Sequence, residues 1–214
     1  DTGLGKTAWL QNLVVSTPNL DCLYLSLEVH DHLIYRRFLQ IANGIKKEKV
    51  MDLHSVDLNG ELQNAITPIE HINIMTTTPE IGSMKQLITE LSPKIVVIDT
   101  IDAIKVNYNN DPFNKMEIII NELKQLAVQE SIIIIGVSHI SKSASFESRL
   151  TVHSGKGNSV IEQKADKVIG IMGEREATRR VIRSLKSRDE AKFQVSLLFD
   201  YETFRFKETE HVQS

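Results

Sequence analysis

Residues Lys94–Asp99 read KIVVID, a run of apolar, mostly β-branched residues that ends in a carboxylate. Two further runs are similarly apolar, Cys22–Leu27 (CLYLSL) and Ile132–Val137 (IIIIGV). Continuous apolar runs of this length are typical of strands that are buried on both faces, as in a parallel sheet covered by helices. We therefore expect these three runs to be buried strands of one sheet.

Helical spacing of apolar residues marks the segments between these runs. Leu33–Leu39 is one such segment, and Gly44 is its natural stop because glycine readily adopts the left-handed conformation that ends helices. Ser83–Leu91 and Asn114–Gln129 are two more, and His71–Met75 is a further short strand. Alternating strands and helices predict an α/β fold, a mainly parallel and doubly wound sheet flanked by helices.

The pattern changes after residue 139. Lys167–Met172, Arg179–Leu185 and Phe193–Phe199 follow one another as strands with short connections, which predicts a C-terminal antiparallel extension of the sheet. Residues 207–214 are polar and read as a tail. We expect a single α/β domain over residues 1–206.

The composition is that of an ordinary globular domain. Of 214 residues, 41% are hydrophobic, and 25 basic against 28 acidic residues give a net charge of −3. This charge argues against a histone-like coat for nucleic acid, although it leaves room for a local basic channel. The single cysteine, Cys22, is expected to be buried, and no apolar stretch is long enough to span a bilayer.

The residues Gly3-Leu4-Gly5-Lys6-Thr7 fit most of the phosphate-binding P-loop pattern, a glycine, four residues and then Gly-Lys-Ser/Thr. The pattern's first glycine would fall one position before Asp1. Lys6 would reach the β- and γ-phosphates of ATP and the Thr7 hydroxyl would bind Mg²⁺. A flexible turn before a helix is the alternative. The nucleotide-binding candidates are Gly3, Leu4, Gly5, Lys6, Thr7 and Ala8.

Two carboxylates at strand ends complete the candidate site. Asp99 follows a buried strand, at the edge where α/β sheets bind ligands, and could hold the Mg²⁺ shell opposite Thr7. Glu28 follows the strand after the P-loop helix and could polarise the attacking water. A capping aspartate and a solvated glutamate are the alternatives.

These residues, in this order, resemble the ATPase motor of DnaB-type hexameric helicases, a group that includes Twinkle-like mitochondrial and phage helicases. The similarity begins with Gly-Lys-Thr, Ser26–Glu28 and Val96–Asp99. It continues through Gly136–His139 (GVSH), Gly157–Asp166 (GNSVIEQKAD) and Leu185–Arg188 (LKSR), and so covers nearly the whole chain. The resemblance implies a RecA-like P-loop NTPase that uses ATP and Mg²⁺.

The resemblance also implies residue roles. Lys6, Thr7 and Asp99 would bind phosphate and Mg²⁺, and Glu28 would be the catalytic base. His139 would sense the γ-phosphate, unless it is an ordinary histidine at a strand end. Lys186 and Arg188 match a Lys-x-Arg element that reaches the nucleotide of a neighbouring subunit, unless they belong to a solvated basic hairpin.

DNA contact is expected in the polar stretch after residue 139. In the family this region lines a central channel, and here it contains Lys142, Arg149 and Lys156. An ordinary surface loop is the alternative. The expected partners are single-stranded DNA, further copies of the chain in a hexamer, and a primase or helicase loader, without a membrane.

The leading hypothesis is therefore a replicative DNA helicase motor that translocates 5′-to-3′ as a ring, in the cytoplasm of a bacterial or phage-infected cell, with a mitochondrial or other organellar origin left open. The alternatives are a RadA- or KaiC-like ATPase in recombination or signalling, and a non-hydrolysing loader or assembly subunit. The family's first P-loop glycine and preceding strand are missing from the sequence. We expect a fragment of a longer protein, with a groove of unpaired backbone and weakened nucleotide binding or activity.

Overall fold

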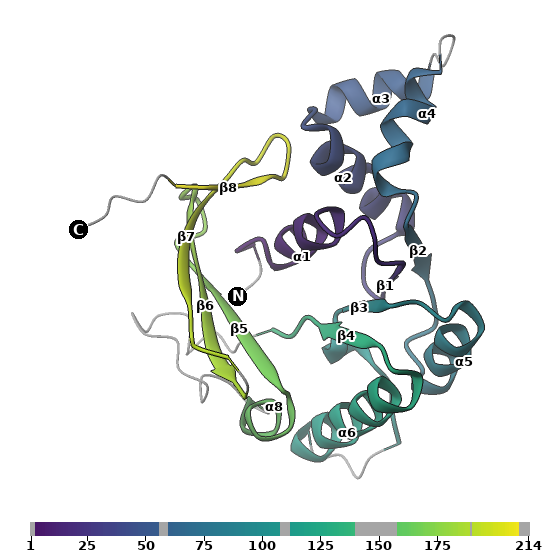
Figure 1. The fold of residues 1–214 in the computed structure, drawn as a ribbon, viewed down its shortest axis with the longest axis vertical. Helices are drawn as coiled ribbons and strands as arrows, with labels where there is room; N and C mark the ends of the chain where they lie inside the picture. Colours follow the sequence, from purple (N-terminus) through teal and green to yellow (C-terminus); the bar gives the residue numbers. More distant parts are fainter. Residues whose placement is uncertain (1–2, 56–59, 108–111, 140–157, 189, 210–214) are drawn as a thin grey trace.

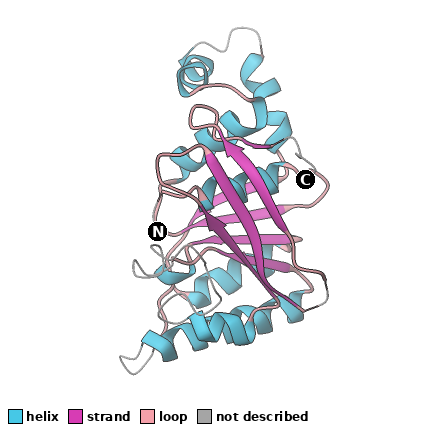
Figure 2. Cartoon of the chain, turned by 90° about the vertical axis from the view of Figure 1, so that its left-hand side faces the viewer, coloured by secondary structure: helices cyan, strands magenta, loops and turns pink. Residues whose placement is uncertain are grey.

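The computed structural model describes residues 3–55, 60–107, 112–139, 158–188 and 190–209 (Figure 1). It contains two four-stranded sheets, one parallel and one antiparallel. Figure 2 shows the antiparallel sheet in front of the parallel one, with helices gathered around the latter. A mainly parallel sheet flanked by helices with a C-terminal antiparallel extension is the predicted fold class, and this prediction is confirmed.

The parallel sheet has the strand order β2-β1-β3-β4. Its register places Ser26 opposite Asp99 and Ile98 opposite Gly136, so β1, β3 and β4 end at one common edge. All five residues of β1 and all five of β3 are buried, as the sequence predicts. The four strands are β1 (Cys22–Ser26), β2 (Ile72–Thr76), β3 (Ile95–Asp99) and β4 (Ile133–Gly136).

Helices cover both faces of this sheet. Leu10 of the first helix and Phe38 of the second pack with Tyr24 on one face, whereas Met84 and Ile119 pack with Leu25 on the other. The helices are α1 (Lys6–Val15), α2 (Asp31–Asn43), α3 (Lys47–Ser55), α4 (Glu61–Ile66), α5 (Ile81–Leu91), α6 (Pro112–Glu130) and α8 (Asn158–Lys164), with short 3-10 turns η1 (Thr67–Ile69) and η2 (Ile101–Ala103).

Helix boundaries agree with the sequence where a terminating residue is present. Gly44 ends α2 in the left-handed conformation, with φ of 64°. The helices α3 and α4 are not anticipated by the sequence. Both are short and lie in a charged segment, where apolar spacing is weak and tertiary packing decides the conformation.

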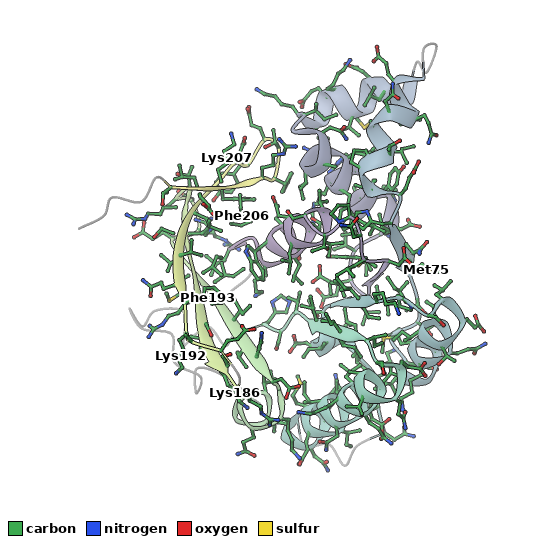
Figure 3. The ribbon with its side chains drawn as sticks, viewed as in Figure 1. Met75, Lys186, Lys192, Phe193, Phe206 and Lys207 are labelled. Atoms are coloured by element: carbon green, nitrogen blue, oxygen red, sulfur yellow. The ribbon has the colours of Figure 1, made fainter. Side chains whose placement is uncertain are left out.

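The antiparallel sheet has the order β5-β6-β7-β8. It packs on the start of the chain, because Leu4 is buried with Ile171, Ile182 and Leu197. Figure 3 shows Phe206 between this sheet and α1. The strands are β5 (Lys167–Met172), β6 (Arg179–Ser187), β7 (Gln194–Phe199) and β8 (Phe206–Glu208).

The strand β4 differs from expectation. The sequence predicts that it is buried on both faces, but Ile133 is 56% exposed and β4 is an edge strand of the parallel sheet.

A groove of about 630 Å³ lies between β4, β5 and α1, and Leu10, Ile134 and Ile171 contribute to its walls. Within the described ranges, no helix is long and apolar enough to cross a bilayer.

Candidate nucleotide-binding site

The site begins at a glycine turn that leads into α1. Gly3 and Gly5 have φ of 100° and 87°, which only glycine adopts readily, so the turn depends on both residues. Gly5 is the N-cap of α1 and offers no side chain to the first helical N–H groups. Such a turn at the positive end of a helix is suited to an anion, because successive N–H groups can point at it.

Lys6, on the first turn of α1, lies at the edge where the parallel strands end. Its Nζ is 3.2 Å from Nδ1 of His139, which comes just after β4. Nε2 of His139 is in turn 3.9 Å from Oε2 of Glu28, which comes just after β1. If the ammonium donates to Nδ1, the proton of a neutral imidazole is on Nε2 and faces the Glu28 carboxylate.

Glu28 is also held from the other side. The Thr100 hydroxyl, just after β3, donates to Oε1 of Glu28 at 3.1 Å. Thr100 is buried, whereas the Glu28 side chain is 48% exposed. One carboxylate oxygen is thus oriented from the core, and the other lies near His139 at the open edge of the sheet.

Asp102, which no motif in the sequence singles out, fixes the position of His139. Its Oδ2 accepts the backbone N–H of His139 at 2.9 Å, and its Oδ1 accepts the Ser138 hydroxyl at 3.2 Å. The only sequence signal is a second carboxylate three residues after Asp99. Asp102 thereby ties η2 to the end of β4.

Electrostatics at Lys6 reflect two opposing effects. Burial lowers the pKa of the Lys6 ammonium below its usual range, and the carboxylates of Asp102, Asp99 and Glu28 oppose this by favouring the charged form. The ammonium is therefore poorly solvated and surrounded by negative charge. A bound polyphosphate would add further negative charge beside the ammonium and so favour its charged form.

Asp99 is 5% exposed, and the Tyr24 hydroxyl donates to its Oδ2 at 2.9 Å. Thr7 lies on the first turn of α1 and is half-buried. Among the residues that the structure describes, no three His, Cys, Asp or Glu side chains form a metal cluster. Mg²⁺ in nucleotide sites is bound by one or two protein oxygens together with phosphates and water. The Asp99 carboxylate and the Thr7 hydroxyl are donors of this kind, so these residues fit the ion.

The family model for the DnaB-like helicase C-terminal domain matches residues 1–208. The chain belongs to this family. A comparison with curated proteins found no match.

Solved structures share the fold of this DnaB-like domain. One of them, described as an ATPase domain, has a TM-score of 0.83 and 22% identity, covering 98% of this chain and 82% of that one. A DnaB-like replicative helicase, described with its interactions with primase, has a TM-score of 0.82 and 22% identity, covering 98% of this chain and 56% of that one. The RadB recombinase has a TM-score of 0.61 and 12% identity, covering 98% of this chain and 88% of that one. The fold is therefore RecA-like.

The DnaB-like domain does not bring all the predicted residues together. Lys6, Glu28 and His139 meet at one edge, whereas Figure 3 shows Lys186 beside α8 and away from α1. Arg188 lies just after β6, with Nη1 at 3.0 Å from Oδ1 of Asp166. This separation is compatible with the predicted action on a neighbouring subunit. The predicted DNA-binding residues Lys142, Arg149 and Lys156 lie outside the described residues.

Proposed function

We propose that this DnaB-like domain is the ATP-hydrolysing motor of a replicative DNA helicase. The observation that carries the proposal is the meeting of Lys6, Glu28 and His139 at the open edge of the parallel sheet, beside the start of α1. Such an edge, next to a glycine turn, is where α/β sheets place nucleotide chemistry. Membership of the helicase family favours this function over a RadA- or KaiC-like role.

The nucleotide phosphates would lie on the turn from Gly3 to Ala8, with Lys6 on the β- and γ-phosphates. Thr7 and Asp99 would hold Mg²⁺, which neutralises phosphate charge when it is bound. The Tyr24 hydroxyl donates to Oδ2 of Asp99, which would leave Oδ1 as the carboxylate oxygen that serves Mg²⁺.

Hydrolysis requires a positioned base for the attacking water. Glu28 would accept a proton from this water as its oxygen bonds to the γ-phosphorus and the bond from that phosphorus to the β,γ-bridging oxygen breaks, which releases ADP and phosphate. Thr100 donates to Oε1 of Glu28, which supports Oε2 as the oxygen that would accept the proton. The non-hydrolysing alternative is disfavoured because Lys6, Thr7, Glu28 and Asp99 are all present.

His139 would report the state of the γ-phosphate. It contacts Lys6, which would bind that phosphate, and its backbone N–H is anchored to Asp102. The residues that follow include the three DNA-binding candidates, Lys142, Arg149 and Lys156. Loss of the γ-phosphate would move Lys6 relative to His139 and so change the start of this DNA-facing segment.

Assembly completes the proposed motor. Copies of the chain would form a ring, with six as the expected number, in which Arg188 and Lys186 reach the nucleotide of the neighbouring subunit. The ring would translocate 5′-to-3′ on single-stranded DNA and cooperate with a primase or loader. The DnaB-like structural relative is described with primase, which supports this choice of partner.

The test uses the full-length protein that contains this domain. We expect hydrolysis that single-stranded DNA stimulates, together with unwinding of a duplex that carries a 5′ single-stranded tail. Glu28→Gln should bind ATP without hydrolysing it, whereas Glu48→Gln, at an exposed position of α3, should behave as the wild type. Hydrolysis that DNA leaves unchanged would contradict the helicase proposal.

A further inference from the structure

The Arg180 side chain in β6 is a buried cation directly behind the glycine turn. It is 0% exposed, whereas Arg179 and Arg183 on the same strand are exposed. Buried charges in proteins are normally paired with an opposite charge, because transfer of an ion out of water costs several kcal/mol. The burial of the Arg180 charge therefore suggests that the charge has a function.

Its hydrogen bonds satisfy the guanidinium without neutralising it. Arginine has five N–H donors, and in the described part of the chain five uncharged oxygens accept from this side chain. The rings of Phe199 and Tyr201 each lie 5.9 Å from its central carbon. The acceptors are the carbonyl oxygens of Leu4, Arg175, Ala177 and Arg179 and the hydroxyl of Tyr201.

The space for this arginine is built into the fold. A Cβ atom at Gly173 would lie 3.0 Å from Cδ of Arg180 and 2.9 Å from the carbonyl oxygen of Arg179. The Tyr201 hydroxyl accepts from Nη2 at 2.7 Å and itself lies within hydrogen-bond distance of the Arg175 and Ala177 carbonyl oxygens. The guanidinium is thus held on several sides.

One of the five contacts reaches the glycine turn. Nε of Arg180 donates to the Leu4 carbonyl at 3.0 Å, and Leu4 lies between the two left-handed glycines, Gly3 and Gly5. In a trans peptide the carbonyl and the next N–H point in opposite directions. The N–H of Gly5 therefore points away from Arg180. A cation on the carbonyl side also polarises the peptide and strengthens its N–H as a donor.

We infer that Arg180 is a positioning residue of the phosphate-binding turn. It fixes the Leu4–Gly5 peptide so that the Gly5 N–H can donate to phosphate. Its charge, which no carboxylate among the described residues neutralises, adds positive potential that a di- or triphosphate neutralises. The inference rests on the proposed nucleotide binding. Arg180 acts through the Leu4 peptide and a buried field, so it is not a catalytic residue.

Binding measurements on the full-length protein test this role. By isothermal titration calorimetry, Arg180→Met should weaken binding of ADP and of inorganic pyrophosphate at least about tenfold, as expected for loss of a charge-assisted interaction. The affinity for adenosine, measured by ligand-observed NMR, should equal that of the wild type. Arg179→Met makes the same charge change on the exposed face of the same strand, and its affinities should stay within about twofold of wild type.

The outcomes separate the inference from the proposed function. Wild-type affinity for pyrophosphate in folded Arg180→Met, or an equal loss for adenosine and pyrophosphate, would overturn the positioning role alone. Should Arg180→Met not fold, Arg180→Lys carries the test, and pyrophosphate should raise its Tm less than that of the wild type. An equal rise would overturn the role. A wild-type protein that binds neither ADP nor pyrophosphate would overturn the proposed function itself.

Discussion

The Tyr24 hydroxyl donates a hydrogen bond of 2.9 Å to Oδ2 of Asp99 from inside the core of the parallel sheet. Tyr24 is 0% exposed, and burial together with the Asp99 charge raises its pKa well above the usual range. The hydroxyl therefore stays protonated and remains a donor. The carboxylate expected to serve Mg²⁺ is oriented from behind by a residue of the neighbouring strand.

Tyr24→Phe removes this hydrogen bond and little else. Loss of a buried hydrogen bond to a charged group should lower the free energy of unfolding by about 1–3 kcal/mol. It should also raise the Mg²⁺ concentration at which ADP binding is half-maximal, because Asp99 is less well oriented. Calorimetric titrations of ADP at several Mg²⁺ concentrations measure this shift. Tyr35→Phe, on α2, is the control, and an unchanged Mg²⁺ requirement in Tyr24→Phe would refute the orienting role.

Thr100→Val tests the orientation of Glu28. The valine preserves the buried shape, but it cannot donate to Oε1, so the carboxylate becomes less well fixed. We expect kcat for ATP hydrolysis to fall about tenfold, which is about 1.4 kcal/mol in the barrier, with little change in ATP affinity. The matched control is Thr89→Val, which removes a threonine hydroxyl that lies 3.2 Å from Glu130. A change confined to KM would argue that Thr100 serves binding instead.

His139 variants test the relay from the nucleotide to DNA. His139→Ala loses the contact with Lys6, so we expect ATP hydrolysis that single-stranded DNA no longer stimulates. His139→Gln keeps an acceptor for the ammonium and should retain part of the stimulation. His32→Ala, at a 71% exposed position, should leave stimulation unchanged. Stimulation of wild-type size in His139→Ala would exclude the relay.

The predictable parts of the site are those that follow from strand ends. Glu28, Asp99 and His139 each come at the end of an apolar run, and parallel strands bring such ends to one edge. Contacts between distant segments carry no such signal. Arg180 and Leu4 are 176 positions apart, and Tyr24 and Asp99 are 75 apart. Their pairing depends on side-chain packing that a single sequence does not reveal.

In the fold, too, local features can be predicted from the sequence, whereas features that depend on contacts between distant segments cannot. Apolar runs and Gly44 locate β1, β3 and the end of α2, because these features act locally. The exposure of Ile133 is different, since burial of a strand depends on its neighbour in the sheet as well as on its own residues. The apolar character of β4 therefore predicts a strand correctly and its burial incorrectly.

The Cys22 thiol offers a test of the core by titration. It is 0% exposed, and burial raises its pKa from 9.0 to about 12. Between these values the unfolded chain loses the proton while the folded chain keeps it, so stability should fall as pH rises from about 9 to 12. Denaturant unfolding at several pH values should show a steeper decline for wild type than for Cys22→Ala. Parallel declines would mean that the thiol titrates normally in the folded protein.

Arg188 provides the test of assembly. Its side chain is 48% exposed, and Nη1 lies 3.0 Å from the Asp166 carboxylate, which Lys124 also contacts at 2.8 Å. Exposed ion pairs contribute little stability, so exchange of this partner for the nucleotide of the proposed neighbouring subunit would cost little. We expect Arg188→Ala to abolish turnover while ATP binding is preserved, because the stabilisation of transition-state charge is lost. Arg183→Ala, on the exposed face of β6, is the control, measured in the same hydrolysis and binding assays. Weak binding with normal turnover at saturating ATP would show that Arg188 does not act in trans.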